Sequence, residues 1–278
     1  MGIEGRVAVV TGASSGIGRA CVDALAESGY TTFAAARSLS EGSFEDVGNH
    51  EGILRGLRMD VDDEASVREA IAAVLDDVGR IDVVVNCAGF GIAGSVEDTS
   101  IDEGKQQFET NLFGIHRVCR AVLPTMRTQG AGRIVNVSSI AGRIGLPYQG
   151  LYSATKFAIE GLTEALRMEL RPFGIKVSLI EPGDFNTGFT ASRRCVEASG
   201  EGPYVDRFAR ALAAAESDEL GGHPPERAAR LLLRILGSRS PRLRYTVGPL
   251  SQRLSAMAKP LLPGGIVEHE VMKHYDVL

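Results

Sequence analysis

Short apolar runs alternate with longer segments of helical periodicity along most of this chain, and this alternation constrains its fold more than any other feature. The runs span residues 6–11, 31–36, 54–59, 81–86, 133–139, 175–182 and 243–247. Between them apolar residues recur at helical spacing. Strands that are apolar on both faces are typical of a parallel sheet covered on each side. With right-handed crossovers, the pattern predicts a doubly wound α/β domain, a Rossmann fold of about seven strands with helices on both faces.

Residues 184–222 depart from this alternation. They place Phe185, Phe189, Tyr204 and Phe208 between glycines and charged residues, without a strand pattern. A mobile insertion or a lid over a site fits such a segment better than a core element.

A C-terminal extension, residues 249–278, follows the last strand pattern. Between residues 239 and 259 the chain has four Arg and one Lys and no acidic residue, and the apolar residues 260–263 come next. A peripheral membrane contact is one interpretation; a solvated basic face or a subunit contact is the more ordinary one. We expect a single domain over residues 1–278.

Composition excludes several classes of function. Thirty Lys and Arg against 35 Asp and Glu leave a net charge of −5, so the chain offers no general positive field to a nucleic acid. The four cysteines are scattered and have no metal-ligand spacing, which predicts neither a zinc site nor a disulfide framework. No apolar run reaches the roughly 18 residues of a membrane span, and no secretory signal pattern is present, so we expect a cytoplasmic protein.

The sequence TGASSGIG at residues 11–18 lies between the first strand and the first helix. Glycines there permit a tight turn, and the N–H groups at the helix N-terminus can approach a pyrophosphate. A tight turn without a ligand is the alternative, but the strand before and the helix after it favour dinucleotide binding. The predicted contacts are Gly12, Ser14, Ser15, Gly16, Ile17 and Gly18.

The end of the second strand bears on the choice of dinucleotide. An Asp or Glu there would bind the 2′-hydroxyl of NAD, but the strand ends at Ala36 and Arg37 follows. An arginine can pair with the 2′-phosphate of NADP, so we expect NADP, with NAD the less favoured cofactor. Asp60 and Val61, after the third strand, are candidates for the adenine, although Asp60 is equally well explained as a turn or helix-capping residue.

Three motifs together resemble the classical short-chain dehydrogenases/reductases over residues 5–248: TGASSGIG, Asn86-Cys87-Ala88-Gly89 after the fourth strand, and YSATK at residues 152–156. The resemblance implies a catalytic tetrad. Its members are Asn111 in TNLFG, Ser139 at 13 positions before the tyrosine, Tyr152 and Lys156. It further implies that the cofactor contacts Asn86, Ala88, Gly89, Tyr152, Lys156, Pro182, Gly183 and Thr187.

The spacing of the tetrad agrees with its chemistry. Tyr152 and Lys156 are four residues apart on a predicted helix and share one face. A free tyrosine has a pKa of about 10, and we expect the nearby ammonium to lower the pKa of Tyr152 toward neutrality. Ser139 can hydrogen-bond the substrate oxygen, and Asn111 can position a water that relays protons to Lys156.

Sequence details around these motifs look most like the branch that contains estrogenic 17-beta-hydroxysteroid and retinol dehydrogenases. That resemblance implies a lipophilic alcohol or carbonyl substrate. Aromatic and apolar residues after the carboxyl ends of strands are the expected substrate contacts, together with Ser139. They are Phe90, Leu146, Tyr148, Phe185 and Phe189.

The favoured interpretation is an NADP-dependent oxidoreductase that interconverts an alcohol with its ketone or aldehyde. A noncatalytic dinucleotide-binding regulator would not need the tetrad, and an epimerase or dehydratase of the same fold is a third possibility. The resemblance also implies a homodimer or homotetramer built on the helices predicted at 102–128 and 152–172.

Overall fold

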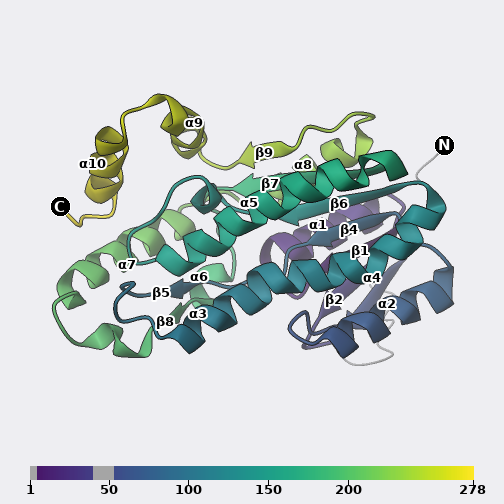
Figure 1. Ribbon diagram of the computed structural model, residues 1–278, viewed down its shortest axis with the longest axis horizontal. Helices are drawn as coiled ribbons and strands as arrows, with labels where there is room; N and C mark the ends of the chain where they lie inside the picture. Colours follow the sequence, from purple (N-terminus) through teal and green to yellow (C-terminus); the bar gives the residue numbers. More distant parts are fainter. Residues whose placement is uncertain (1–4, 40–52) are drawn as a thin grey trace.

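The structure, a computed structural model, describes residues 5–39 and 53–278, and its centre is one parallel sheet (Figure 1). Seven strands lie in the order β3-β2-β1-β4-β6-β7-β9. They are β1 Val7–Thr11, β2 Thr31–Ala36, β3 Leu54–Arg58, β4 Val83–Asn86, β6 Gly132–Val137, β7 Ile175–Pro182 and β9 Arg244–Val247. The chain builds outward from β1 to β3 and then returns to β4 on the other side of β1. This confirms the doubly wound fold and places a topological switch point between β1 and β4.

Helices cover both faces of the sheet and form two cores. One core packs α2 (Glu64–Val78), α4 (Gly114–Gln129) and α5 (Gly150–Leu170) on the sheet, and the other packs α1 (Gly16–Glu27) and α8 (Glu226–Gly237). In β1, Val7 and Val9 join the first core, whereas Ala8 and Val10 join the second. Because successive side chains of a strand point to opposite faces, a strand buried on both sides must be apolar throughout.

The helix predicted at 102–128 is interrupted. Ser100 and Glu103 form a capping box at the start of α3 (Ile101–Phe108), a π-helical turn follows at Glu109–Phe113, and α4 then continues to a glycine C-cap at Gly130. Periodicity over a long window did not reveal this widened turn, which contains Asn111. Such turns are often found at functional sites.

The expectation that residues 184–222 lack a strand is wrong. Arg194–Cys195 forms β8, which pairs in parallel with β5 (Ile92–Ala93) in a separate two-stranded sheet. The segment also contains α6 (Phe189–Ser192) and the 16-residue helix α7 (Val205–Leu220). Strands of two residues are too short to give a periodic signal, so only their pairing identifies them.

The C-terminal extension folds back on the domain as α9 (Leu250–Ala258) and α10 (Gly264–His274), joined by a 3₁₀ turn at Lys259–Leu261 (Figure 1). Buried Ala256 and Val277 anchor it. Lys259 donates to the carbonyl of Arg143 and lies over the ring of Phe157. Among the described residues, no helix combines the length and apolarity that crossing a membrane requires.

Candidate active site

A cavity of about 890 Å³ runs along the carboxyl ends of the strands. Its walls come from the turns after β1, β2, β3, β4, β6 and β7, from α5 and α7, and from α9 and α10. Open α/β sheets bind ligands at this edge, where strand ends and helix N-termini converge. Most of the site residues predicted from the sequence lie in this wall.

The glycine-rich turn after β1 forms one end of the cavity, and all six residues predicted there line it. Gly12 has a φ of +65°, and a Cβ at this position would lie 2.7 Å from the backbone of Ala88. Thr11 joins the turn to the β4 loop because its hydroxyl accepts hydrogen bonds from the N–H groups of Cys87 (3.1 Å) and Ala88 (3.2 Å). The turn is therefore too tight for any residue but glycine at position 12.

Arg37, Asp60 and Val61 line the same end of the cavity. Arg37 is exposed directly after β2. The Oδ1 atom of Asp60 accepts a hydrogen bond from the N–H of Asp62 at 3.1 Å, and Asp63 provides the N-cap of α2. Asp60 is thus a turn residue that also faces the cavity, while the capping role belongs to Asp63.

Asn86 does not line the cavity, although Ala88 and Gly89 do. Its side chain is buried and donates to Asn136 Oδ1 at 2.8 Å, and Asn136 in turn donates to Thr163 at 2.9 Å. Asn86 therefore links β4 to β6 and α5 instead of reaching a ligand. A buried amide finds its partners inside the fold, which motif spacing alone does not reveal.

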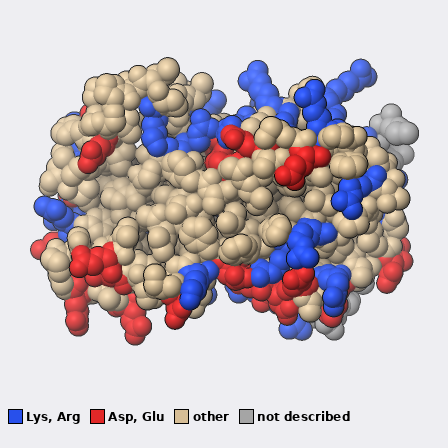
Figure 2. Space-filling view, in the orientation of Figure 1, with Lys and Arg blue, Asp and Glu red and all other residues tan. Residues whose placement is uncertain are grey.

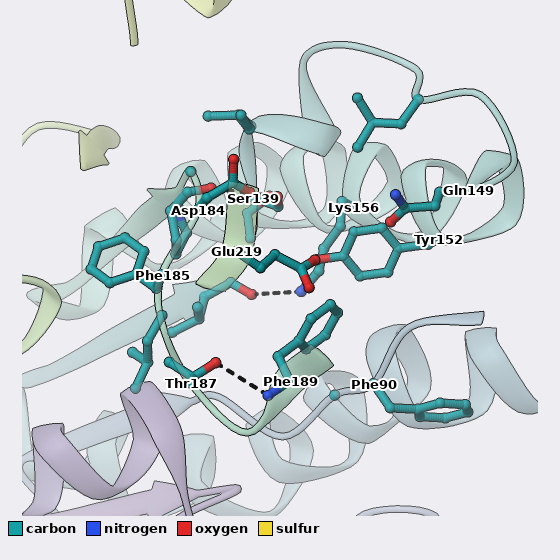
Figure 3. Close-up of a pocket in the computed structure, with 18 of the residues that line it drawn as sticks. Phe90, Ser139, Gln149, Tyr152, Lys156, Asp184, Phe185, Thr187, Phe189 and Glu219 are labelled. Atoms are coloured by element: carbon teal, nitrogen blue, oxygen red, sulfur yellow. Dashed lines mark hydrogen bonds between the residues drawn. The ribbon is translucent and has the colours of Figure 1, made fainter. Parts of the chain in front are cut away.

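Tyr152 and Lys156 project from α5 into the same space (Figure 3). Lys156 Nζ lies 5.6 Å from the centroid of the Tyr152 ring and donates to the Val137 carbonyl at 3.2 Å. Ser139, two residues after β6, accepts a hydrogen bond from the N–H of Ala141 at 3.1 Å and donates to the carbonyl of Pro182 at 3.4 Å. Phe189 packs on the tyrosine ring with a centroid distance of 5.7 Å. The structure thus brings together the hydroxyl, ammonium and phenol predicted from the sequence.

Burial dominates the protonation of this group and corrects the expectation for the tyrosine. It raises the pKa of Tyr152 to about 12, opposed by hydrogen bonding to Ser139 and reinforced by the nearby carboxylate of Glu219. Burial also lowers the pKa of Lys156 to about 8. Desolvation penalises the charged form of each group, so a tyrosine becomes a weaker acid while a lysine loses its proton more easily.

Asn111 lies in the π-helical turn and is buried behind the cavity wall. Its Nδ2 donates to the Phe90 carbonyl (3.0 Å) and to Thr155 Oγ1 (3.1 Å), and its Oδ1 accepts from the N–H of Phe90 (3.0 Å). The side chain therefore holds the loop after β4 against α5. A water relay from Asn111 to Lys156 stays a prediction.

Of the predicted substrate contacts, Phe90, Leu146, Phe185 and Phe189 line the cavity, whereas Tyr148 does not. The Tyr148 ring packs against Tyr204 and Phe208, at centroid distances of 6.4 and 5.7 Å. Those two residues, predicted to close over the site, also lie outside its lining. The three rings instead form an aromatic cluster that joins α7 to the loop before α5.

On the cofactor side, Pro182, Gly183 and Thr187 line the cavity after β7. Gly16 and Thr187 face each other closely, since a Cβ on Gly16 would lie 3.2 Å from Thr187 Cβ. The hydroxyl of Thr187 accepts from the N–H of Phe189 at 3.2 Å (Figure 3). This contact fixes the start of α6 beside the glycine-rich turn.

The part of the wall that α9 and α10 provide was not predicted from the sequence. Apolar side chains of this wall include Leu254, Ala258, Leu262 and Ile266, which recur every fourth residue. That period is a helical signal and could have identified an amphipathic face, although not what it covers. Asp184 and Glu219 were missed as well, and both line the cavity near Ser139 and Tyr152.

In the described ranges 5–39 and 53–278, no group of three or more His, Cys, Asp or Glu side chains could hold a metal ion. Cys87 is half-buried in the cavity wall, and Cys119 is buried. Burial raises the pKa of Cys87 to about 11 and that of Cys119 to about 12, which disfavours the thiolate in both.

Comparisons with known proteins agree with this geometry. Residues 6–197 match the family described as short chain dehydrogenase. A 3-ketodihydrosphingosine reductase from Bacteroides thetaiotaomicron is 40% identical over 276 residues, which cover 99% of this chain and 100% of that protein. The branch that contains 17-beta-hydroxysteroid and retinol dehydrogenases is not specifically supported.

Two solved structures are similar over most of the chain. An alcohol dehydrogenase from Thermococcus sibiricus, complexed with 5-hydroxy-NADP, has a TM-score of 0.71 at 28% identity and covers 88% of this chain and 97% of its own. A short chain dehydrogenase/reductase from Burkholderia phymatum, in complex with NAD, has a TM-score of 0.78 at 28% identity and covers 94% of this chain and 96% of its own.

Proposed function

Because the chain belongs to the short-chain dehydrogenase family, we propose that it is an NADP-dependent reductase of a long-chain ketone, with 3-keto sphingoid bases as the substrate class. One observation carries the proposal. The cavity that contains Tyr152, Lys156 and Ser139 continues into an apolar wall formed by α9 and α10. A cavity that has these polar side chains at one end and an extended apolar wall at the other suits a ketone on an alkyl chain.

The residues of the glycine-rich turn and of the strand ends around it fit a nicotinamide dinucleotide. The turn after β1 has no room for a side chain at Gly12, and it opens at the N-terminus of α1 opposite Thr187. This turn would hold the pyrophosphate, with Asp60 and Val61 at the adenine and with Pro182, Gly183 and Thr187 at the nicotinamide. When bound, the reduced nicotinamide supplies a hydride to the carbonyl carbon.

The chain's own residues supply the proton and the orientation. With a pKa raised to about 12, Tyr152 is a protonated phenol at neutral pH and can donate its proton to the carbonyl oxygen. Ser139 lies on the neighbouring strand end and can donate a hydrogen bond to the same oxygen. Lys156, largely protonated at neutral pH, favours the phenolate that remains. At neutral pH reduction can therefore start from the resting form of Tyr152, whereas oxidation must start from its phenolate.

The substrate class is supported by the relative from Bacteroides thetaiotaomicron, whose name is 3-ketodihydrosphingosine reductase. A lipophilic steroid or retinoid, expected from the sequence, would use the same apolar wall. A single flexible alkyl chain agrees better with a wall built from separate aliphatic side chains of α9 and α10. A comparison of kcat/KM for a sphingoid ketone, a steroid and a retinoid decides between these substrate classes.

The test is reduced-cofactor oxidation with 3-ketodihydrosphingosine, a steroid ketone, retinal and acetone. We expect kcat/KM to be highest for the sphingoid ketone and lowest for acetone, because buried apolar area contributes about 25 cal/mol per Å². A flat series would contradict the long-chain proposal. Cofactor binding without turnover of any carbonyl would instead support a noncatalytic regulator. Conversion of a substrate without net oxidation of the cofactor would support an epimerase or dehydratase.

The cofactor preference rests on Ala36 and Arg37, since one of the two similar structures is complexed with 5-hydroxy-NADP and the other with NAD. A charge-assisted phosphate contact contributes roughly 1.5–3 kcal/mol, so NADPH should bind at least about tenfold more tightly than NADH. Ala36→Asp combined with Arg37→Ile should reverse the order. Equal or tighter binding of NADH to the wild type in a fluorescence titration would overturn the preference.

A further inference from the structure

Asp184 occupies a distinctive place in the cavity wall. It follows Gly183 at the end of β7, and Figure 3 shows it beside Ser139. Its backbone N–H donates to Gln252 Oε1 at 3.0 Å, and Gln252 Nε2 donates back to the Asp184 carboxylate. This reciprocal pair holds the carboxylate in a fixed orientation and joins the catalytic end of the sheet to α9.

The neighbouring carboxylates of α7 already have partners. Glu219 is paired with Arg193, and these side chains are 12% and 2% exposed. Thr190 also donates to Glu219 at 2.6 Å. Asp218 lies 2.6 Å from His274 Nε2. The charge of Glu219 is thus compensated inside the protein.

Asp184 differs because it forms no ion pair with any residue in the described part of the chain. Gln252 gives it a neutral donor but no positive charge. Burial raises its pKa to about 6, reinforced by the charges of Asp218 and Glu219 and opposed by that hydrogen bond and by His274. At neutral pH the cavity wall therefore contains an ionised, half-buried carboxylate that has no ion-pair partner among the described residues, a state that a cationic ligand would stabilise.

We propose that Asp184 binds the ammonium group of an amino ketone substrate while Tyr152 and Ser139 hold its carbonyl oxygen. The inference rests on the proposed function, because a 3-keto sphingoid base has its amine on the carbon next to the carbonyl. Ser139 donates to Pro182, two residues before Asp184, so carbonyl and ammonium ligands come from adjoining strand ends. Asp184, Ser139 and Tyr152 line the same cavity.

The rest of the cavity agrees with this orientation. Gln252 connects Asp184 to α9, and the apolar residues Leu254 of α9, Leu262 of the connection and Ile266 of α10 follow along the cavity wall. An alkyl chain that leaves the carbonyl on the side away from the amine can run along this apolar wall. Asp184 would then determine specificity for an amine beside the ketone, whereas the chemical step would use Tyr152.

The variant Asp184→Asn tests the proposal because it keeps the size of the side chain and a carbonyl acceptor for Gln252. We expect KM for 3-ketodihydrosphingosine to rise tenfold or more, which is the size of one lost charge-assisted contact, with kcat changed only a few-fold. For the matched ketone without the amine, KM should not change. Glu268→Gln is the control, because Glu268 is an exposed carboxylate of α10 that does not line this cavity.

The outcomes separate this inference from the proposed function. Equal KM values of the wild type for the amino and the des-amino ketone would overturn the role of Asp184 and leave the reductase proposal intact, whereas turnover of neither ketone would overturn the reductase proposal. The role of Asp184 would also be overturned by an equal rise in KM for both ketones in Asp184→Asn, or by a rise in KM for the amino ketone in Glu268→Gln but not in Asp184→Asn. Unchanged NADPH affinity reports an intact variant site. Independently of any variant, a long-chain amine should inhibit the wild type at least about tenfold more strongly than its N-acetyl derivative, and equal inhibition would contradict the ammonium site.

Discussion

Burial moves the two central titrating groups of the site in opposite directions. The pKa of Tyr152 rises to about 12, and the pKa of Lys156 falls to about 8. Near pH 7 the site therefore contains a neutral phenol beside a lysine that is mostly charged. A carbonyl oxygen that gains a hydride develops negative charge, and both groups are then in the protonation state that stabilises it.

Replacing Tyr152 by phenylalanine removes the proton donor and keeps the ring that packs on Phe189. We expect kcat for ketone reduction to fall by about 10²–10⁴-fold, the usual contribution of general acid–base catalysis, with the Kd of the cofactor nearly unchanged. Stopped-flow turnover and a binding titration measure the two quantities. Activity within a few-fold of wild type would remove Tyr152 from the mechanism.

Lys156 should limit activity at high pH. Its ammonium is lost as the pH rises through about 8, so kcat/KM for the reduced cofactor, which reports the free enzyme, should decline above that pH. Lys156→Arg keeps a positive charge at every accessible pH and should shift the decline to higher pH. Lys156→Met should have a low kcat/KM over the whole pH range. A wild-type profile that stays level to pH 10 would show that this ammonium is not required.

Among the helices, α9 and α10 have a role that the sequence did not predict, because both line the cavity. Leu254 of α9, Leu262 between the two helices and Ile266 of α10 are more than 40% exposed, yet they line the cavity, so much of that exposed area faces the substrate space. Within α9 and α10 only Ala256 is buried, and Val277 is buried just after α10. Elements with few buried contacts open at low free-energy cost, which suits a wall that must admit a long ligand.

The double variant Leu262→Ser, Ile266→Ser tests this role. It removes apolar contact area from the cavity, and we expect kcat/KM for a long-chain ketone to fall roughly tenfold, while a short ketone is affected little. Leu261→Ser is the matched control, because Leu261 is 85% exposed and does not line the cavity. A similar loss for long and short ketones would show that the helices do not contact the alkyl chain.

At the scale of the whole molecule, the face formed by α3, α4 and α5 has an unusual surface. Figure 2 shows a broad area without charged side chains over these helices, with Lys, Arg, Asp and Glu mostly around its borders. Exposed apolar residues on this face include Ile101 (75%) of α3, Phe113 (46%) of the π-helical turn and Met168 (69%) of α5. Apolar patches of this kind often mark an interface between subunits.

We predict that this face mediates self-association, as expected from the helices at 102–128 and 152–172. Met168→Glu combined with Ile101→Glu should shift the protein from dimer or tetramer toward monomer, because a charge buried at an interface has no partner there. Sedimentation velocity at micromolar concentration measures the change. Leu220→Glu, on exposed α7, is the control and should leave the sedimentation coefficient unaltered. A wild type that sediments as a monomer would contradict the prediction.

The parallel sheet and the grouping of Ser139, Tyr152 and Lys156 were predictable from the sequence alone. Most strands of the sheet are apolar runs, the helices have their own period, and the glycine-rich turn and the Tyr152–Lys156 pair are defined by spacings of a few residues. Properties this local are visible without knowledge of distant contacts. That is why seven strands, the place of the cavity and the positions of Ser139, Tyr152 and Lys156 could all be predicted.

Only the tertiary structure decided the remainder of the site, because it depends on contacts between residues far apart in the chain. Gln252 reaches Asp184 across 68 positions, Asn86 turns inward to Asn136, and Tyr148 joins an aromatic cluster with Tyr204 instead of the cavity. The pKa of Tyr152 likewise rises because the surrounding fold excludes water, whereas the sequence showed only the nearby lysine. Partner choice and desolvation are properties of the packed molecule, and no local pattern encodes them.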